Sequence, residues 1–311
     1  RTLRAATELD PSLVAMLEQL SIAPTALVRA NLLSVSAIAG AGDAALRTAI
    51  GPDAAAALQD AVRLTAVTPR ELEVASARLT IGERLGAGSF GTVHAVTLDG
   101  ERLALKRVSL AGLPPAQRDE TLRAATREVR ALIRLVHLYI VRLYGVVVDE
   151  QGSVGMLLEL APRGSLRDLL DSSPAEVVGR EAVQMELAAN VASAMAFLHA
   201  QTPPVLHHDL KSGNVLVFVT AAGALQAKLT DFGLSITASG STLASTMRAS
   251  GGTVAYQAPE QFDDTFTAAS EVYAFAVIVW ELLHGGRPWV GKTAAVIMRA
   301  VDRGQRPAIT A

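Results

Sequence analysis

The chain has 311 residues, 50% of them hydrophobic, and its 28 basic and 30 acidic side chains give a formal net charge of -2. This length allows two domains of ordinary size, and the apolar content is far too high for a disordered tail. A charge near zero provides no field that would steer the chain toward nucleic acid or anionic membranes, so we expect neither partner. The absence of cysteine excludes disulfide scaffolds and thiolate metal sites. The longest apolar stretches are shorter than the roughly 18 residues of a membrane span, so we expect none.

Residues 1–68 are rich in alanine and leucine and poor in residues that favour strands. Proline follows Asp10 and Gly51, which is typical of helix starts, and the glycines at 40 and 42 indicate a break between helices. Apolar residues recur at spacings of three and four, at Leu13, Met16, Leu17 and Leu20 and again at Ala54, Leu58, Ala61 and Val62. We predict a module of three to five short helices, with no glycine loop, metal ligands or catalytic cluster.

The pattern changes after Thr68-Pro69-Arg70. Apolar and polar residues alternate over about 79–85 and again from Val93, which is typical of strands joined by turns. A long amphipathic helix is predicted from the apolar positions Leu122, Ala125, Val129, Leu132, Ile133 and Val136. Short apolar strands are expected at 143–148 and 154–160, and from about residue 181 the chain is predicted to be mainly helical. This order indicates an α+β domain with a small β-rich lobe followed by a large helical lobe.

A glycine cluster lies between two of the predicted strands. Glycines there let the backbone approach phosphate oxygens and offer them N–H donors. Taken alone, the cluster fits a phosphate-binding loop and an ordinary glycine-rich hairpin about equally. A dinucleotide-binding fold is disfavoured because a strand, not a helix, follows. The residues concerned are Gly86, Gly88, Ser89, Phe90, Gly91 and Val93.

Two charged residues after this cluster are candidates for phosphate chemistry. Strand alternation puts Ala104 and Lys106 on one face, so that an apolar residue can touch a base while a cation reaches phosphates. The ordinary alternative for Lys106 is a solvated charge, and for Glu128, among arginines on the predicted helix, a surface ion pair. Only four of the 28 basic residues are lysine. Since arginine is a poor substitute for a compact ammonium, lysine at 106 and 211 points to a chemical requirement.

The decisive residues come later in the chain. Residues 207–214 read His-His-Asp-Leu-Lys-Ser-Gly-Asn, and Asp231-Phe232-Gly233 and Ala258-Pro259-Glu260 follow. Together with the glycine loop, Lys106 and Glu128, these make six motifs in order, and on them the chain resembles a eukaryotic-type protein kinase over residues 76–311. The resemblance implies a two-lobed protein kinase fold, ATP and Mg²⁺ as cofactors, and transfer of the γ-phosphate of ATP to protein hydroxyls.

The resemblance also assigns roles to single residues. It implies that Lys106 holds the α- and β-phosphates and pairs with Glu128, while Asp209 accepts or orients the proton of the substrate hydroxyl. Lys211 would neutralise the γ-phosphate, braced with Asp209 by Thr253. Phosphoryl transfer needs such alignment and positive charge more than covalent chemistry. The implied magnesium ligands are Asn214 and Asp231.

The adenine site is implied in the same way. Val93, Ala104 and Leu216 would enclose the base, the backbone from Glu159 to Ala161 would form hinge hydrogen bonds, and Leu158 would be the gatekeeper. The resemblance further implies an apolar column that links the lobes, formed by Leu132, Leu143, His207 and Phe232. We expect these residues to be in the core whether or not the chain is a kinase.

Several short stretches of the sequence indicate which group of protein kinases the chain most resembles. Residues 209–214 and 252–260 have the serine/threonine form, whereas Gly164–Leu170, Glu271–Phe275 and Gly286–Trp289 resemble the tyrosine-kinase-like (TKL) group, which generally acts on serine and threonine. Two alternatives come from other classes. The chain could be a pseudokinase or scaffold that binds ATP or partners without turnover, or the helical module could be the working part and the kinase fold its regulator.

The chain departs from the family pattern at several positions. His208 stands where arginine is usual, so we expect loop phosphorylation to be at most a partial, pH-sensitive switch. Glu271 replaces an anchoring aspartate, so we expect the anchor to be shifted rather than lost. Arg306 matches the family's buried partner of Glu260. The chain ends at Ala311, before the last helices of the large lobe, and we expect exposed apolar surface there.

The N-terminal module faintly resembles a sterile-alpha-motif domain in Leu46-Arg47 and Ile50-Gly51-Pro52, and a plain helical linker is the alternative. The resemblance implies a protein partner or self-association. The chain begins at Arg1 with no basic and apolar leader. We therefore expect it to be a piece of a longer, cytoplasmic polypeptide.

Overall fold

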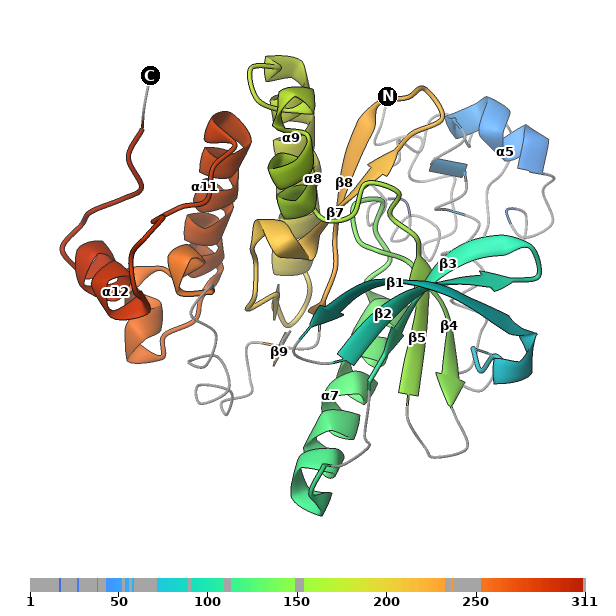
Figure 1. Cartoon of the computed structure of the whole chain (residues 1–311). Helices are drawn as coiled ribbons and strands as arrows, with labels where there is room; N and C mark the ends of the chain where they lie inside the picture. Colours follow the sequence, from blue (N-terminus) through green and yellow to red (C-terminus); the bar gives the residue numbers. More distant parts are fainter. Residues whose placement is uncertain are drawn as a thin grey trace. The chain divides into compact units, whose positions relative to one another are not determined.

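The structure, a computed structural model, describes residues 17, 27, 38, 43–51, 54–55, 58, 72–88, 91–108, 113–148, 154–232, 236–237 and 253–309. The chain divides into two compact units (Figure 1). One comprises Arg1–Leu160 with Thr220–Ala222, and the other Ala161–Val219 with Gly223–Ala311. The division between Leu160 and Ala161 falls within the predicted hinge.

The described positions before residue 60 are helical except for Gly51. Helix α5 (Asp43–Ile50) ends where Gly51 takes a φ of 85° and donates its N–H to the carbonyl of Arg47 at 2.9 Å. This left-handed conformation suits glycine, which has no Cβ to clash. Six of the apolar residues described here are buried: Leu17, Leu27, Ile38, Leu46, Ala55 and Leu58. Much of the predicted module, including Leu13, Met16 and Leu20, lies outside the described residues.

The first unit contains a five-stranded antiparallel sheet of order β1-β2-β3-β5-β4. Its strands are β1 (Leu79–Gly88), β2 (Gly91–Leu98), β3 (Glu101–Arg107), β4 (Leu143–Val148) and β5 (Val154–Glu159). The strands predicted at 143–148 and 154–160 are thus confirmed to within one residue. A short helix, η1 (Ser76–Arg78), precedes β1.

The chain is already attached to this sheet before residue 76, the predicted domain start. Val74 donates its N–H to the carbonyl of Val146 at 2.8 Å, and Val146 donates to the carbonyl of Leu72 at 2.7 Å. These bonds extend the sheet beyond β4 by a short parallel segment. Leu72 is buried and Val74 packs against the apolar core of the sheet.

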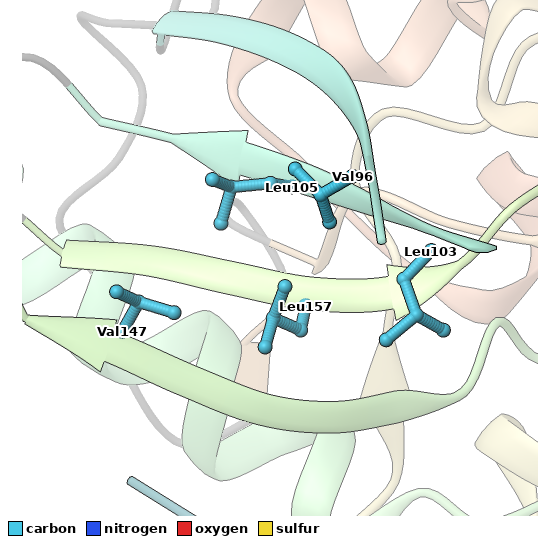
Figure 2. Packing of buried hydrophobic residues seen from close by; sticks show 5 residues of the cluster. All are labelled: Val96, Leu103, Leu105, Val147 and Leu157. Atoms are coloured by element: carbon cyan, nitrogen blue, oxygen red, sulfur yellow. The ribbon is translucent and has the colours of Figure 1, made fainter. Parts of the chain in front are cut away.

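The two faces of the sheet have different side chains because successive residues of a strand point to opposite faces. One face carries an apolar cluster from four strands, which Figure 2 shows from close by: Val96, Leu103, Leu105, Val147 and Leu157. Ala104 and Lys106 alternate with Leu103 and Leu105 and therefore lie on the other face. Helix α7 (Pro115–Arg134) lies on that second face against β4 and β5, and ends before Val136, which the sequence pattern had included.

The second unit is mainly helical. Helix α9 (Glu181–His199) confirms the helix predicted from about residue 181, and it buries Leu187, Val191, Ala194 and Leu198 while Val183 is half-buried. A hairpin lies beside it, and Asn190 of α9 accepts the N–H of Ala227 at 2.9 Å. The remaining elements are α8 (Leu166–Ser172), η2 (Pro174–Glu176), β6 (Val205–Leu206), η3 (Ser212–Asn214), β7 (Val215–Val219), β8 (Leu225–Leu229), β9 (Ile236–Thr237), η5 (Thr253–Tyr256), η6 (Pro259–Asp263), α11 (Ala268–His284) and α12 (Ala294–Asp302).

Helix α11 is bounded by conventional signals and has exposed apolar residues. Thr267 caps its first turn by accepting the N–H of Ser270, and Gly285 ends it at a φ of 72°. Val272 and Leu283 on this helix, and Val290 after it, are each more than half exposed. Among the described residues, no helix is both long enough and apolar enough to cross a bilayer.

Candidate active site

The described glycines of the cluster lie at the end of β1 and the start of β2, and a strand does follow the cluster, as predicted. Gly86 pairs with Val93 and Gly88 with Gly91. A Cβ at Gly91, whose φ is 140°, would lie 1.9 Å from the carbonyl oxygen of Arg107 on β3. Glycine at this position therefore allows β2 and β3 to approach. Ser89 and Phe90 lie outside the described residues.

Lys106 and Glu128 form a buried ion pair. The Lys106 ammonium lies 2.7 and 2.9 Å from the two carboxylate oxygens of Glu128. Their side chains are only 14% and 5% exposed, so the alternatives of a solvated lysine and a surface ion pair are wrong. Removing both charges from water is costly unless they are well paired, and the bidentate geometry provides that pairing. The pair fixes α7 to β3.

The predicted adenine residues of the first unit share the Lys106 face of the sheet. Val93 lies directly opposite Lys106, and Ala104 directly opposite Leu158. Opposed residues of antiparallel strands point to the same face. Glu159, at the end of β5, donates its backbone N–H to Arg142 and accepts the N–H of Arg142 on its carboxylate. The Glu159 side chain thus orders the segment that leads to Ala161.

The second unit brings together the polar residues of the predicted catalytic loop. Asp209 is 8% exposed, and one of its carboxylate oxygens lies 2.6 Å from the Lys211 ammonium. The amide nitrogen of Asn214, in η3, donates to that same oxygen at 2.9 Å and to the Asp209 carbonyl at 2.8 Å. This arrangement aligns one carboxylate oxygen between a cation and an amide. Leu216 follows on β7, half-buried.

Two aromatic rings support this loop from within the unit. His207 is fully buried, and its Nε2 lies 2.9 Å from the carbonyl of Thr230. Its ring centroid lies 5.0 Å from that of Phe232. Asp231, between these contacts, has a φ of 68°, a left-handed conformation unusual for a residue other than glycine. The predicted contact of His207 with Phe232 is confirmed, while Leu132 and Leu143 are buried in the first unit.

Glu271 anchors the catalytic loop from α11. One carboxylate oxygen accepts the backbone N–H of His208 at 2.8 Å, and the other lies 2.7 Å from Nε2 of His199. Burial raises the pKa of Glu271, but these hydrogen bonds and the nearby histidines outweigh it, so the pKa lies below its usual value. The Glu271 side chain, which is longer than that of the usual aspartate, therefore still reaches the catalytic loop and anchors it. His208 itself has a φ of 65°, and burial lowers its pKa.

Residues 79–311 match the family described as protein tyrosine and serine/threonine kinase. The chain belongs to this family. It is 35% identical over 232 residues to Serine/threonine-protein kinase CTR1 of Arabidopsis thaliana, an alignment that covers 74% of this chain and 27% of that protein. It is 32% identical to Probable serine/threonine-protein kinase drkD of Dictyostelium discoideum, covering 76% of this chain and 17% of that one. A third relative, Calmodulin-binding receptor-like cytoplasmic kinase 2 of Arabidopsis thaliana, is 35% identical, with 66% and 49% covered.

These matches confirm the kinase fold and the resemblance to TKL serine/threonine kinases inferred from the sequence. The chain spans less than half the length of each of these three relatives. The roles of single residues rest on the motifs and on the geometry above.

This kinase contains a buried polar network that was not predicted from the sequence. The Tyr256 hydroxyl of η5 donates to a Glu281 carboxylate oxygen at 3.0 Å and lies 3.1 Å from the hydroxyl of Ser212 in η3. Arg167 of α8 donates to the other Glu281 oxygen at 2.8 Å. A partial signal was present, because Arg167 and Glu281 each lie beside leucines in the sequence, but their pairing spans 114 residues.

One expected ion pair of this kinase is wrong. Arg306 is exposed and forms no ion pair with Glu260, although both residues are described. Its guanidinium instead donates to the carbonyls of Val301 and Gln305 and lies 5.0 Å above the ring of Tyr273. Glu260 accepts the hydroxyl of Ser270 at 2.7 Å. The Arg306 guanidinium thus has nearby carbonyls and the Tyr273 ring as partners in place of the Glu260 carboxylate.

The residues predicted to hold magnesium fit that ion. Mg²⁺ prefers oxygen ligands and is usually held by one or two protein groups together with phosphate oxygens and waters. The Asn214 amide nitrogen is occupied by Asp209, which leaves its amide oxygen for a cation. Asp231 adds a carboxylate. Among the described residues, no group of three or more acidic, histidine or cysteine side chains is arranged to hold a metal ion.

Proposed function

We propose that this kinase transfers the γ-phosphate of ATP to serine and threonine hydroxyls of protein substrates in a signalling process. The observation that supports this most directly is the buried carboxylate of Asp209, one oxygen of which lies 2.6 Å from the Lys211 ammonium and 2.9 Å from the Asn214 amide. A carboxylate held in this way can receive a proton while a cation stands beside the acceptor oxygens.

The first unit would bind the nucleotide. The ion pair with Glu128 holds the Lys106 ammonium in one place, where it can contact the α- and β-phosphates without losing further side-chain freedom. Backbone N–H groups of the glycine loop would contact the phosphates. The apolar residues Val93, Ala104 and Leu158 suit a flat base, and the backbone at Glu159 offers it hydrogen-bonding groups.

The second unit would position the acceptor. Asp209 would take the proton of the serine or threonine hydroxyl on its carboxylate, so that the hydroxyl oxygen can form the new bond to phosphorus as the bond to the leaving oxygen breaks. Lys211 would offset charge on the transferred group, and Thr253, whose side chain lies outside the described residues, is proposed to brace both. Bound ATP and Mg²⁺ supply the phosphoryl group and offset its charge. Asn214 and Asp231 would hold the ion.

Residues 1–68 are proposed as an interaction module for a protein partner or for self-association. The buried apolar positions at Leu17, Leu27 and Ile38 support an ordered helical module rather than a plain linker. A cytoplasmic location, where ATP is available, is part of the same proposal.

Label transfer from radioactive ATP to a generic protein substrate tests the activity. We expect Asp209→Asn and Lys106→Met each to reduce the rate by about 100-fold or more, because each removes a group that aligns reactants. Lys292→Met is the matched control, since it removes an exposed lysine to which no role in the reaction is assigned. Equal labelling by wild type and Asp209→Asn would contradict the proposal. Absence of labelling while ATP still binds would favour the scaffold alternative. The histidine at position 208, where the family usually has arginine, supports that alternative.

A further inference from the structure

The outer face of α7 carries a row of arginines that the kinase reaction does not use. Positions 123, 127, 130 and 134 recur at spacings of four and three, so they lie on one side of the helix. The opposite side contains Ala125, Glu128 and Leu132, which are buried. With a rise of 1.5 Å per residue, the row extends for about 16 Å along the axis. We call residues Arg123, Arg127, Arg130 and Arg134 the arginine row.

Three of the four side chains of the arginine row are described, and all three are exposed. Arg123, Arg130 and Arg134 are exposed, and none of them takes a hydrogen bond or ion pair from the part of the chain that the structure describes. The side chain of Arg127 is not described. Two acidic residues of α7, Asp119 and Glu120, precede Arg123 by four and three residues, whereas Glu128 points inward to Lys106 and is 4% exposed. Glu128 therefore cannot neutralise the outer face, and Arg130 and Arg134 have no acidic residue three or four positions away on the helix.

Other surface arginines of the same chain are of two kinds, since Arg299 and Arg303 also lack a side-chain partner among the described residues whereas others are paired. Three of them each meet a carboxylate, namely Arg78 with Asp99, Arg163 with Glu176 and Arg287 with Asp171. Like charges three and four residues apart on a helix repel each other and destabilise it. The arginine row keeps four such charges together although the chain has more acidic than basic residues. An anionic partner would remove this repulsion.

The shape of the arginine row indicates which kind of anion fits. It is a single line about three turns long, and residues 115–134 contain no aromatic side chain on which a nucleic-acid base could stack. The apolar side of α7 faces β4 and β5, so the helix has no free apolar side to enter a bilayer. A line of cations one residue wide matches a line of carboxylates on one helix or strand, and guanidinium groups bind carboxylates in bidentate fashion.

We propose that the arginine row is a docking surface for an acidic segment of a protein, with Asp or Glu side chains spaced at about one helical turn. The surface lies on the side of α7 opposite to the Lys106–Glu128 pair. A docked segment therefore leaves the nucleotide-binding residues accessible.

Binding of a synthetic helical peptide to the full chain tests this proposal. The peptide has glutamates at positions 1, 5, 8 and 12, and its control has glutamines there. We expect the acidic peptide to bind at least about ten-fold more tightly than the control, and this preference to weaken as salt is raised. The triple variant Arg123→Gln, Arg130→Gln, Arg134→Gln should lose the preference. A lysine triple variant at the same positions should keep most of it.

A second triple variant separates local from overall charge. Arg102→Gln, Arg299→Gln and Arg303→Gln also remove three positive charges, all from exposed arginines outside α7. We expect this control to bind the acidic peptide within about two-fold of the wild type. Equal losses in both triple variants, or equal binding of the acidic and glutamine peptides by the wild type, would overturn the proposal. So would binding to anionic vesicles or duplex DNA that depends on the row when the peptide does not bind.

Discussion

His137 is a buried imidazole whose protonation couples folding to pH. It is 5% exposed, and its Nδ1 accepts the backbone N–H of Tyr139 at 3.2 Å. Burial lowers its pKa from 6.5 to about 4. Between these values the unfolded chain binds a proton that the folded chain does not. Stability conferred by the neutral imidazole is therefore present above pH 6.5 and is lost as the pH falls toward 4, by about 3 kcal/mol in all.

The variant His137→Asn isolates this contribution, because asparagine keeps an acceptor but does not titrate. We expect the free energy of unfolding of the wild type to fall more steeply than that of the variant between pH 6.5 and 4, with the two profiles parallel above pH 7. Chemical denaturation at a series of pH values measures both profiles. Profiles that are parallel throughout would show that His137 is accessible to protons in the folded state.

Gly91 makes a second prediction at the residue scale. A Cβ there would collide with the Arg107 carbonyl at 1.9 Å, and the φ of 140° is one that other residues rarely adopt. We expect Gly91→Ala to lower the free energy of unfolding by about 2 kcal/mol, since β2 must move away from β3. Gly86→Ala is the matched control, because nothing lies within 4 Å of its added methyl group. Similar losses of thermal stability in both variants would contradict the steric argument.

At the scale of elements, one buried network joins α8, η5 and α11. Glu281 is fully buried, and burial raises its pKa, while Arg167 and the Tyr256 hydroxyl hold its two oxygens. We expect Arg167→Met to lower the free energy of unfolding by about 3 kcal/mol, because it leaves a buried carboxylate without its cation. The double variant Arg167→Met, Glu281→Gln removes both charges, and we expect it to lower the free energy of unfolding by less than Arg167→Met alone. Denaturant titration of the two single variants and the double variant measures the coupling, and additive losses would exclude it.

The same elements show what the sequence could predict. The strands at 143–148 and 154–160, the helix from 181 and the catalytic-loop residues follow from local periodicity and short motifs, which a linear pattern contains. The Arg167–Glu281 pair and the attachment of Leu72 to β4 depend on residues that the fold alone brings together. The Arg306 expectation was wrong because nearby carbonyls and the Tyr273 ring compete for its guanidinium, a choice that spacing does not reveal.

At the scale of the whole molecule, the hydrogen bonds of Leu72 and Val74 predict where the first unit can be cut. The family match begins at residue 79, yet residues 72–74 pair with β4 and bury Leu72. Removing residues 1–68 keeps this segment, whereas removing residues 1–78 deprives the Val146 N–H of its acceptor and exposes one edge of the apolar core. We expect the shorter fragment to be less stable by about 2 kcal/mol, from the loss of one buried leucine.

Hydrogen exchange at Val146 separates this local effect from general destabilisation. The amide should exchange faster in fragment 79–311 than in fragment 69–311, while that of Ala227, which donates to Asn190 in the second unit, should not differ. Equal protection of Val146 in both fragments would show that residues 72–74 do not belong to the sheet in solution. Sedimentation of fragment 69–311 beside the full chain then tests the helical module separately. If the module mediates self-association, this fragment should lose it and retain phosphoryl transfer, because every residue assigned to the reaction lies after residue 85.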